Sequence, residues 1–119
     1  MFLALGVALI QLNQINDKSA NVKNAVKLIR EAVAKYNPRI VALPETFNTP
    51  YAEKNFASYA EYIPGGETTT ALSSLAKELK VYIMGGSYPE IDKNDAKRFY
   101  NTIVVFSPTG EIIATHRKV

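Results

Sequence analysis

Short apolar runs that alternate with helical stripes constrain the fold of this chain more than any other feature. Apolar runs at residues 5–10, 40–43 and 81–84 have the length and composition of buried strands. Apolar residues at 22–36 and again at 72–79 recur every three or four positions, which predicts amphipathic helices. Strands that alternate with helices are typical of layered α/β proteins. We therefore expect an α/β fold with helices packed on a sheet.

The predicted helices have recognisable ends. Asp17 or Ser19 is placed to cap the first helix, and the Asn37-Pro38 pair ends it, because proline disfavours helical geometry in the preceding residue. Thr68 or Thr69 is placed to cap the second long helix. Between them, residues 44–66 form a long loop in which 55–62 are predicted to be a short helix.

The C-terminal part of the chain predicts a hairpin. A third strand at 81–84 ends in Gly85-Gly86-Ser87, and a polar turn follows at 92–97. Residues 100–106 and 111–118 then form two strands joined by a Pro- and Gly-containing turn. No G-x-G-x-x-G or P-loop motif follows a strand, so a Rossmann-type cofactor site is not expected.

The first twelve residues are almost wholly apolar and have two interpretations. A signal peptide would carry Lys or Arg before the run and a small-residue cleavage site after it, and neither is present. The run is also shorter than the ~20 residues that span a bilayer. Residues 5–10 are therefore predicted to be a first core strand, buried on both faces.

Composition excludes several classes of function. The 14 basic and 11 acidic residues give a net charge of +3, and the basic residues are scattered. A nucleic-acid-binding stripe is therefore not expected. The absence of cysteine excludes disulfides and Cys-based metal sites.

The tripeptide Leu43-Pro44-Glu45 places a carboxylate where a buried strand runs into a loop. A strand end on a fixed scaffold can hold a reactive group still. Glu45 is therefore a candidate catalytic residue, although a carboxylate in this position can also simply bind loop backbone.

Several motifs, in this order and spacing, resemble the nitrilase superfamily of carbon-nitrogen hydrolases, and most closely its Nit2-like omega-amidase branch. These motifs extend over essentially the whole chain, and together they are more specific to the family than any single motif. The motifs are Val7-Ala8-Leu9-Ile10-Gln11-Leu12, Leu43-Pro44-Glu45-Thr46-Phe47-Asn48-Thr49-Pro50-Tyr51, Gly85-Gly86-Ser87, Tyr100-Asn101-Thr102 and Thr115-His116-Arg117-Lys118-Val119.

The resemblance implies roles for three residues. Members of the family use a Glu-Lys-Cys site, in which the glutamate matches Glu45 and the lysine matches Lys118, while the cysteine has no counterpart in this sequence. Glu45 would take the thiol proton, and Lys118 would stabilise the oxyanion. Tyr51 matches a tyrosine of the family's substrate pocket. The resemblance implies neither a cofactor nor a metal.

The resemblance also implies a fold and a setting. Residues 1–119 would be the N-terminal portion of a single carbon-nitrogen hydrolase domain, forming part of an α-β-β-α sandwich with a mixed sheet. The chain alone would be inactive for lack of the nucleophile. We expect a cytoplasmic protein that acts on a small carboxamide, without nucleic-acid or membrane partners. It would be a homo-oligomer, or be completed by a second chain or a missing C-terminal segment.

Other interpretations of the same residues remain. Lys118 could be a surface lysine, and Tyr51 could be a packing aromatic. His116, the only histidine, is expected to lie on a strand edge without a catalytic role. The alternative function is a non-catalytic binding or assembly subunit with a nitrilase-like fold.

Overall fold

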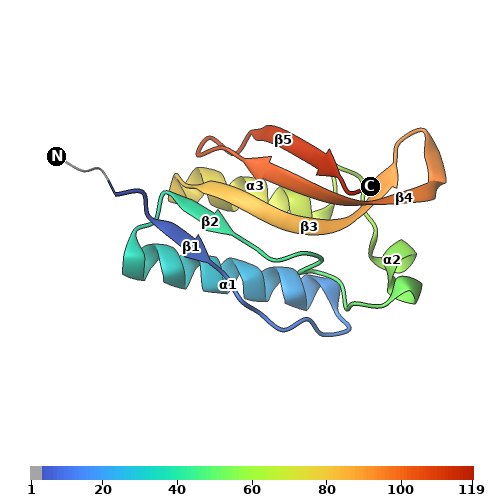
Figure 1. Ribbon diagram of the computed structural model, residues 1–119, viewed down its shortest axis with the longest axis horizontal. Coiled ribbons are helices and arrows are strands. Elements are labelled where there is room, and N and C mark those ends of the chain that lie inside the picture. The colour runs from blue at the N-terminus through green and yellow to red at the C-terminus, as the bar shows by residue number, and fades with distance from the viewer. Residues whose placement is uncertain (1–3) are drawn as a thin grey trace.

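A five-stranded mixed sheet forms the centre of the computed structural model, which describes residues 4–119 (Figure 1). The strands lie side by side in the order in which they occur in the sequence. The first three are parallel, and the last two add antiparallel neighbours. The strands are β1 (Val7–Leu9), β2 (Ile40–Ala42), β3 (Tyr82–Asp92), β4 (Asp95–Phe106) and β5 (Ile112–Arg117).

Two long helices and one short helix complete the fold. They are α1 (Lys18–Tyr36), α2 (Glu53–Tyr59) and α3 (Glu67–Leu79). Helix α1 connects β1 to β2, and the segment with α2 and α3 connects β2 to β3 (Figure 1). Helices α1 and α3 contact each other and also contact strands of the sheet. The α/β class with helices on a mixed sheet is therefore confirmed.

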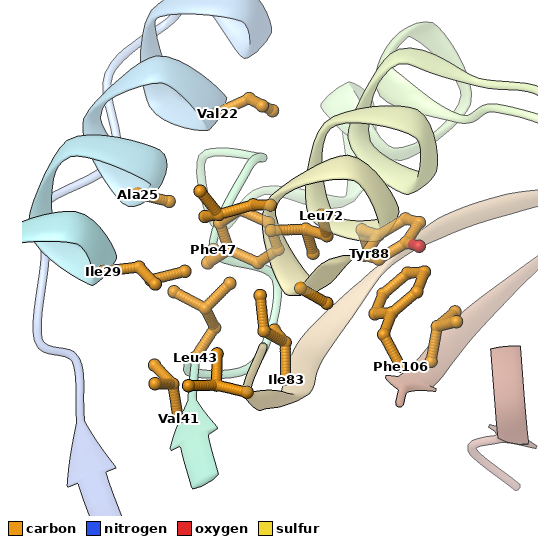
Figure 2. Packing of buried hydrophobic residues seen from close by; sticks show 14 residues of the cluster. Val22, Ala25, Ile29, Val41, Leu43, Phe47, Leu72, Ile83, Tyr88 and Phe106 are labelled. Atoms are coloured by element: carbon orange, nitrogen blue, oxygen red, sulfur yellow. The ribbon is translucent and has the colours of Figure 1, made fainter. Parts of the chain in front are cut away.

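The hydrophobic core lies between these two helices and one face of the sheet (Figure 2). Ile29 of α1, Leu72 of α3 and Ile83 of β3 are fully buried there. Phe47, from the loop after β2, is buried with them and meets the ring of Tyr88 edge to face, with the ring centroids 6.2 Å apart. This aromatic contact anchors the loop that carries Glu45.

The opposite face of the sheet carries exposed apolar side chains. Along β3 and β4, Ile83 and Val104 are fully buried, whereas their neighbours Met84 and Ile103 are 45% and 39% exposed. No segment within residues 4–119 covers those two side chains. One face of the sheet is thus packed and the other is left open by the part of the chain that the structure describes.

The prediction that residues 5–10 form a strand buried on both faces is wrong. Strand β1 is shorter, Val7–Leu9, and lies at the edge of the sheet with β2 as its one neighbour. Val7 and Leu9 are exposed because they lie on the uncovered face. Residues 1–3 of the apolar run lie outside the described residues.

The hairpin prediction is confirmed, but the strands before it are longer than predicted. Strand β3 continues past the glycines to Asp92, through a register shift between Met84 and Ser87. Strand β4 begins at Asp95, so the polar turn predicted at 92–97 contains only residues 93 and 94. Pairing continues because polar side chains such as Glu90 find partners on the neighbouring strands.

The predicted ends of the first helix are confirmed, whereas the predicted cap of α3 and the predicted bounds of the short helix are corrected. Asp17 caps α1, since its Oδ1 accepts a hydrogen bond from Ala20 N at 2.9 Å, and the helix ends before Asn37 in the left-handed conformation (φ 46°). Neither predicted threonine caps α3, whose N-cap is Gly66. The Glu61 carboxylate instead accepts from the first-turn N–H groups. The short helix predicted at 55–62 lies slightly earlier, at Glu53–Tyr59.

Candidate active site

Glu45 lies just beyond the end of β2, in a loop held on both sides. Before it, Leu43 N donates to Met84 O at 2.9 Å, which extends the pairing of β2 with β3. After it, Thr46 N donates to Ser87 Oγ at 3.0 Å. Thr46 has a positive φ of 48°, an uncommon conformation for a β-branched residue. Such strain persists only where the surroundings enforce it, and here it turns the chain sharply after Glu45.

Gly86 allows β3 to approach this loop. Its φ is +57°, and a Cβ atom there would overlap the carbonyl oxygens of Pro44 and Leu43. Only glycine combines that conformation with such a close approach of backbone. The Gly85-Gly86-Ser87 motif thus packs directly against the backbone that carries Glu45.

Lys118 reaches the same place from the other end of the chain. It follows β5, and its backbone N donates to Asn101 O on β4 at 2.8 Å. The preceding residue, Arg117, is held by Glu90 through Nε and Nη2 at 3.0 and 2.8 Å. The Arg117 guanidinium also stacks 3.9 Å from the centre of the Tyr100 ring. These contacts fix the register in which Lys118 leaves the sheet.

The side chains of Glu45 and Lys118 meet. Lys118 Nζ lies 2.9 Å from Glu45 Oε1, and Asn101 Nδ2 donates to the same oxygen at 2.9 Å. The hydrogen bond and positive charge of Lys118, together with the bond from Asn101, lower the pKa of Glu45. Reciprocally, Glu45 raises the pKa of Lys118, and Tyr51 adds a smaller effect. At neutral pH the pair is therefore a carboxylate and an ammonium.

Two hollows adjoin this pair. The first, about 270 Å³, is bordered by the loop after β2 and by α2, and Tyr51 lies on its rim, 88% exposed. The second, about 310 Å³, lies over β3, β4 and β5. Glu45, Asn101 and Lys118 border both hollows. The pair thus lies between two spaces, each large enough for a small molecule or an incoming side chain.

The structure brings together the residues singled out from the sequence. Glu45 and Lys118 are in direct contact, and Tyr51 borders the first hollow. His116 lies on the exposed edge strand β5 and borders the second hollow. Their catalytic and binding roles remain predictions.

Sequence reasoning assigned no role to Asn101. The predicted hairpin gave a partial signal, because a turn at 107–110 places Asn101 opposite His116, two positions from Lys118. A register shift at the end of β4 brings Asn101 opposite Lys118 in the structure. The contact with Glu45 could not be read from that pairing, because it depends on how the loop after β2 meets β4.

Residues 4–119 hold neither a metal-binding cluster nor a membrane-spanning helix. These residues contain no cluster of three or more Asp, Glu or His side chains that could hold a metal ion. Within the same range, none of the helices has both the length and the apolarity to cross a membrane.

The chain is similar in sequence to known proteins. The chain is 50% identical over 113 residues to human "Omega-amidase NIT2" and 44% identical over 110 residues to "Nitrilase homolog 2" of Dictyostelium discoideum. These alignments cover 95% and 92% of this chain, but 39% and 33% of those proteins. The chain therefore spans well under half the length of these curated relatives.

A solved structure shares the fold. The crystal structure of Saccharomyces cerevisiae Nit3, a member of branch 10 of the nitrilase superfamily, superposes with a TM-score of 0.89 at 35% identity. The match covers 97% of this chain and 44% of the yeast chain. The family model described as "Carbon-nitrogen hydrolase" matches residues 6–119. The chain belongs to the carbon-nitrogen hydrolase family.

Proposed function

We propose that this chain is the N-terminal portion of an amidase that hydrolyses a small carboxamide to a carboxylic acid and ammonia. The single observation that carries the proposal is the 2.9 Å contact between Lys118 Nζ and Glu45 Oε1, at a point that borders two hollows. An exposed ion pair contributes little to stability, so stability does not account for its position. The similarity to omega-amidases supports the substrate class.

In the first half of the reaction, Glu45 acts as general base toward a cysteine thiol supplied from outside this sequence. The S–H bond breaks, the proton moves to the carboxylate, and the sulfur attacks the amide carbon. Lys118 stabilises the negative charge that develops on the amide oxygen. The C–N bond then breaks, and the departing nitrogen takes the proton from Glu45 and leaves as ammonia.

In the second half, water hydrolyses the thioester. Glu45, again a carboxylate, takes a proton from the water as its oxygen attacks the acyl carbon, and Lys118 again faces the developing oxyanion. The C–S bond breaks, the thiolate recovers its proton from Glu45, and the carboxylic acid departs. Tyr51, on the rim of the first hollow, positions the substrate.

The same proposal covers the missing nucleophile, the oligomeric state and the cellular location of the protein. Residues 1–119 contain no cysteine, so this polypeptide alone has no amidase turnover. The site is completed by further sequence or by a second chain. We further propose a homo-oligomeric, cytoplasmic protein without nucleic-acid or membrane partners.

Ammonia release from small ω-amides such as α-ketoglutaramate tests the proposal. The complete protein that carries this sequence should release ammonia, and residues 1–119 alone should give only buffer background. In the complete protein, Glu45→Gln and Lys118→Met should each lower kcat/KM by about 10²–10⁴-fold, the range for a lost general base or oxyanion donor.

Matched controls come from charges away from both hollows. Glu31→Gln alters an exposed carboxylate of α1, and Lys97→Met removes an exposed lysine of β4, so both should retain activity within a few-fold. Turnover by residues 1–119 alone would overturn the proposed mechanism. A complete protein that releases no ammonia would favour the binding or assembly subunit.

A further inference from the structure

The hydrogen bonds to Glu45 are distributed unequally over its two carboxylate oxygens. Oε1 accepts from both Lys118 Nζ and Asn101 Nδ2, each at 2.9 Å. Within residues 4–119, no side chain or backbone N–H donates to Oε2. One oxygen is therefore occupied by two donors, and the other keeps its lone pairs available.

Asn101 touches both members of the pair. Its side chain donates to Glu45, and its backbone oxygen accepts from Lys118 N at 2.8 Å. An ionised carboxylate only accepts hydrogen bonds, so the amide must turn Nδ2 toward Glu45. The position of Asn101 on β4 thus determines the orientation of the Glu45 carboxylate and the position of the Lys118 backbone.

The other end of the same amide is unfavourably placed. Asn101 Oδ1 is buried and has no hydrogen-bond partner in the part of the chain that the structure describes. An unsatisfied buried acceptor is destabilising, and an apolar side chain of similar size would avoid that cost. Such a group calls for an explanation other than stability. The contact of Nδ2 with Glu45 supplies one.

We propose that Asn101 is a positioning residue for the general base, which holds Oε1 of Glu45 so that Oε2 is the atom that accepts the proton. The inference rests on the proposed function and adds to it a residue and an atom. During the reaction Lys118 must also face the substrate oxygen, and its ammonium can shift toward it. Asn101, a neutral donor on a strand, keeps the carboxylate in place while that happens.

Two substitutions separate the hydrogen bond from packing. Asn101→Asp keeps the shape of the side chain but replaces the donor with an acceptor and adds a negative charge, whereas Asn101→Ala removes the donor without adding a charge. Asn94→Asp makes the same chemical change in the turn between β3 and β4, away from the site, and serves as the control. The backbone bond to Lys118 N is available in all three variants.

The first measurement needs no turnover. The ¹³C signal of the Glu45 carboxyl is followed through a pH titration in the protein that carries this sequence. The midpoint should move to higher pH in Asn101→Asp and Asn101→Ala, because loss of the donor destabilises the carboxylate, and stay unchanged in Asn94→Asp. Tyr51, Glu53, His116 and Lys118, the other titratable side chains that border the two hollows, are unchanged in every variant.

The second measurement is the pH profile of kcat for ω-amide hydrolysis by the complete protein. Both Asn101 variants should lower kcat by about tenfold to a hundredfold, as expected for a misplaced catalytic group, and shift the acid limb to higher pH. Unchanged midpoints and acid limbs in both variants would overturn the inference even if thermal stability fell. If the wild-type protein hydrolyses no amide but the carboxyl midpoints move, the proposed function fails, and what stands is that Asn101 stabilises the Glu45 carboxylate through its hydrogen bond to Oε1.

Discussion

At the scale of single residues, the site depends on a few side chains whose surroundings fix their charge and direction. Glu45 is held in place by hydrogen bonds from the backbone N–H groups of Leu43 and Thr46. Lys118 is held by the hydrogen bond from its backbone N–H to Asn101 O. Both side chains remain half-exposed, so their contact is electrostatic and directional rather than a product of burial. Substitutions here should change protonation more than folding.

Lys118→Met should raise the pKa of Glu45. In the folded protein, the hydrogen bond and charge of Lys118 lower the pKa of Glu45 below its value in the unfolded chain. The ion pair therefore stabilises the folded state at pH values above the pKa of the unfolded chain. This stabilisation is lost as the pH falls through the pKa of the folded protein. Removing the ammonium should move the ¹³C titration midpoint of Glu45 upward, toward the ordinary pKa of a glutamate. Lys97→Met is the control, and an equal shift in both variants would contradict the assignment.

Gly86→Ala should destabilise the fold and disturb the site together. The substitution combines a positive φ with an overlap against the backbone that leads to Glu45. Gly65→Ala provides the control, since Gly65 also has a positive φ but nothing within 4 Å of its added Cβ. Urea unfolding should show a loss of about 1–3 kcal/mol for the strained backbone of Gly86→Ala, larger than for Gly65→Ala. Only Gly86→Ala should shift the NMR signals of Glu45.

At the scale of elements, one buried carboxylate connects three segments. Glu61, in the loop between α2 and α3, is 5% exposed and accepts from Thr68 N at 2.9 Å and Thr69 N at 3.1 Å. Its other oxygen accepts from the Thr68 hydroxyl and lies 3.4 Å from Lys18 Nζ of α1. The start of α3 is therefore capped from outside the helix.

Glu61→Ala should be more destabilising than loss of an ordinary helix cap. The variant leaves two buried N–H groups unpaired, each costing about 1–3 kcal/mol. Asp17→Ala removes the exposed cap of α1 and should cost about 1 kcal/mol. Urea unfolding of both variants measures the difference. Equal losses would mean that water replaces Glu61 at the start of α3.

At the scale of the whole molecule, the sheet has one packed face and one face that residues 4–119 leave open. The predicted α-β-β-α sandwich would cover the open face with a second sheet. Adjacent residues of β4 report on the two faces separately, because side chains alternate along a strand. Val104 is fully buried, while Ile103 is partly exposed.

Ile103→Thr and Val104→Thr therefore form a matched pair. In residues 1–119 alone, Ile103→Thr should change the free energy of unfolding by less than about 0.5 kcal/mol. Val104→Thr buries a hydroxyl and should cost about 1–3 kcal/mol. Urea unfolding compares them. If Ile103→Thr costs as much as Val104→Thr, the open face is covered in solution, for example by a second copy of the chain.

The order of elements, the helical stripes and the hairpin could be predicted from the residues alone, because these features depend on local periodicity and turn chemistry. The motif resemblance also singled out Glu45 and Lys118. Two predictions from the sequence were wrong. The apolarity of β1 was interpreted as burial on both faces, and a threonine was predicted to cap α3. Neither error was visible locally, since burial and capping depend on which segments come to lie beside an element.

The meeting of Glu45, Asn101 and Lys118 at one point is a result of the three-dimensional packing. Glu45 is 56 residues from Asn101 and 73 residues from Lys118. The parallel crossover through α2 and α3 places β3 beside β2, and the side chain of Glu45 in the loop after β2 then meets Asn101 of β4 and Lys118 after β5. A contact across such a distance depends on sheet order, on the close approach at Gly86 and on the register fixed by Arg117 and Glu90. Those are properties of packing, and no local pattern of residues contains them.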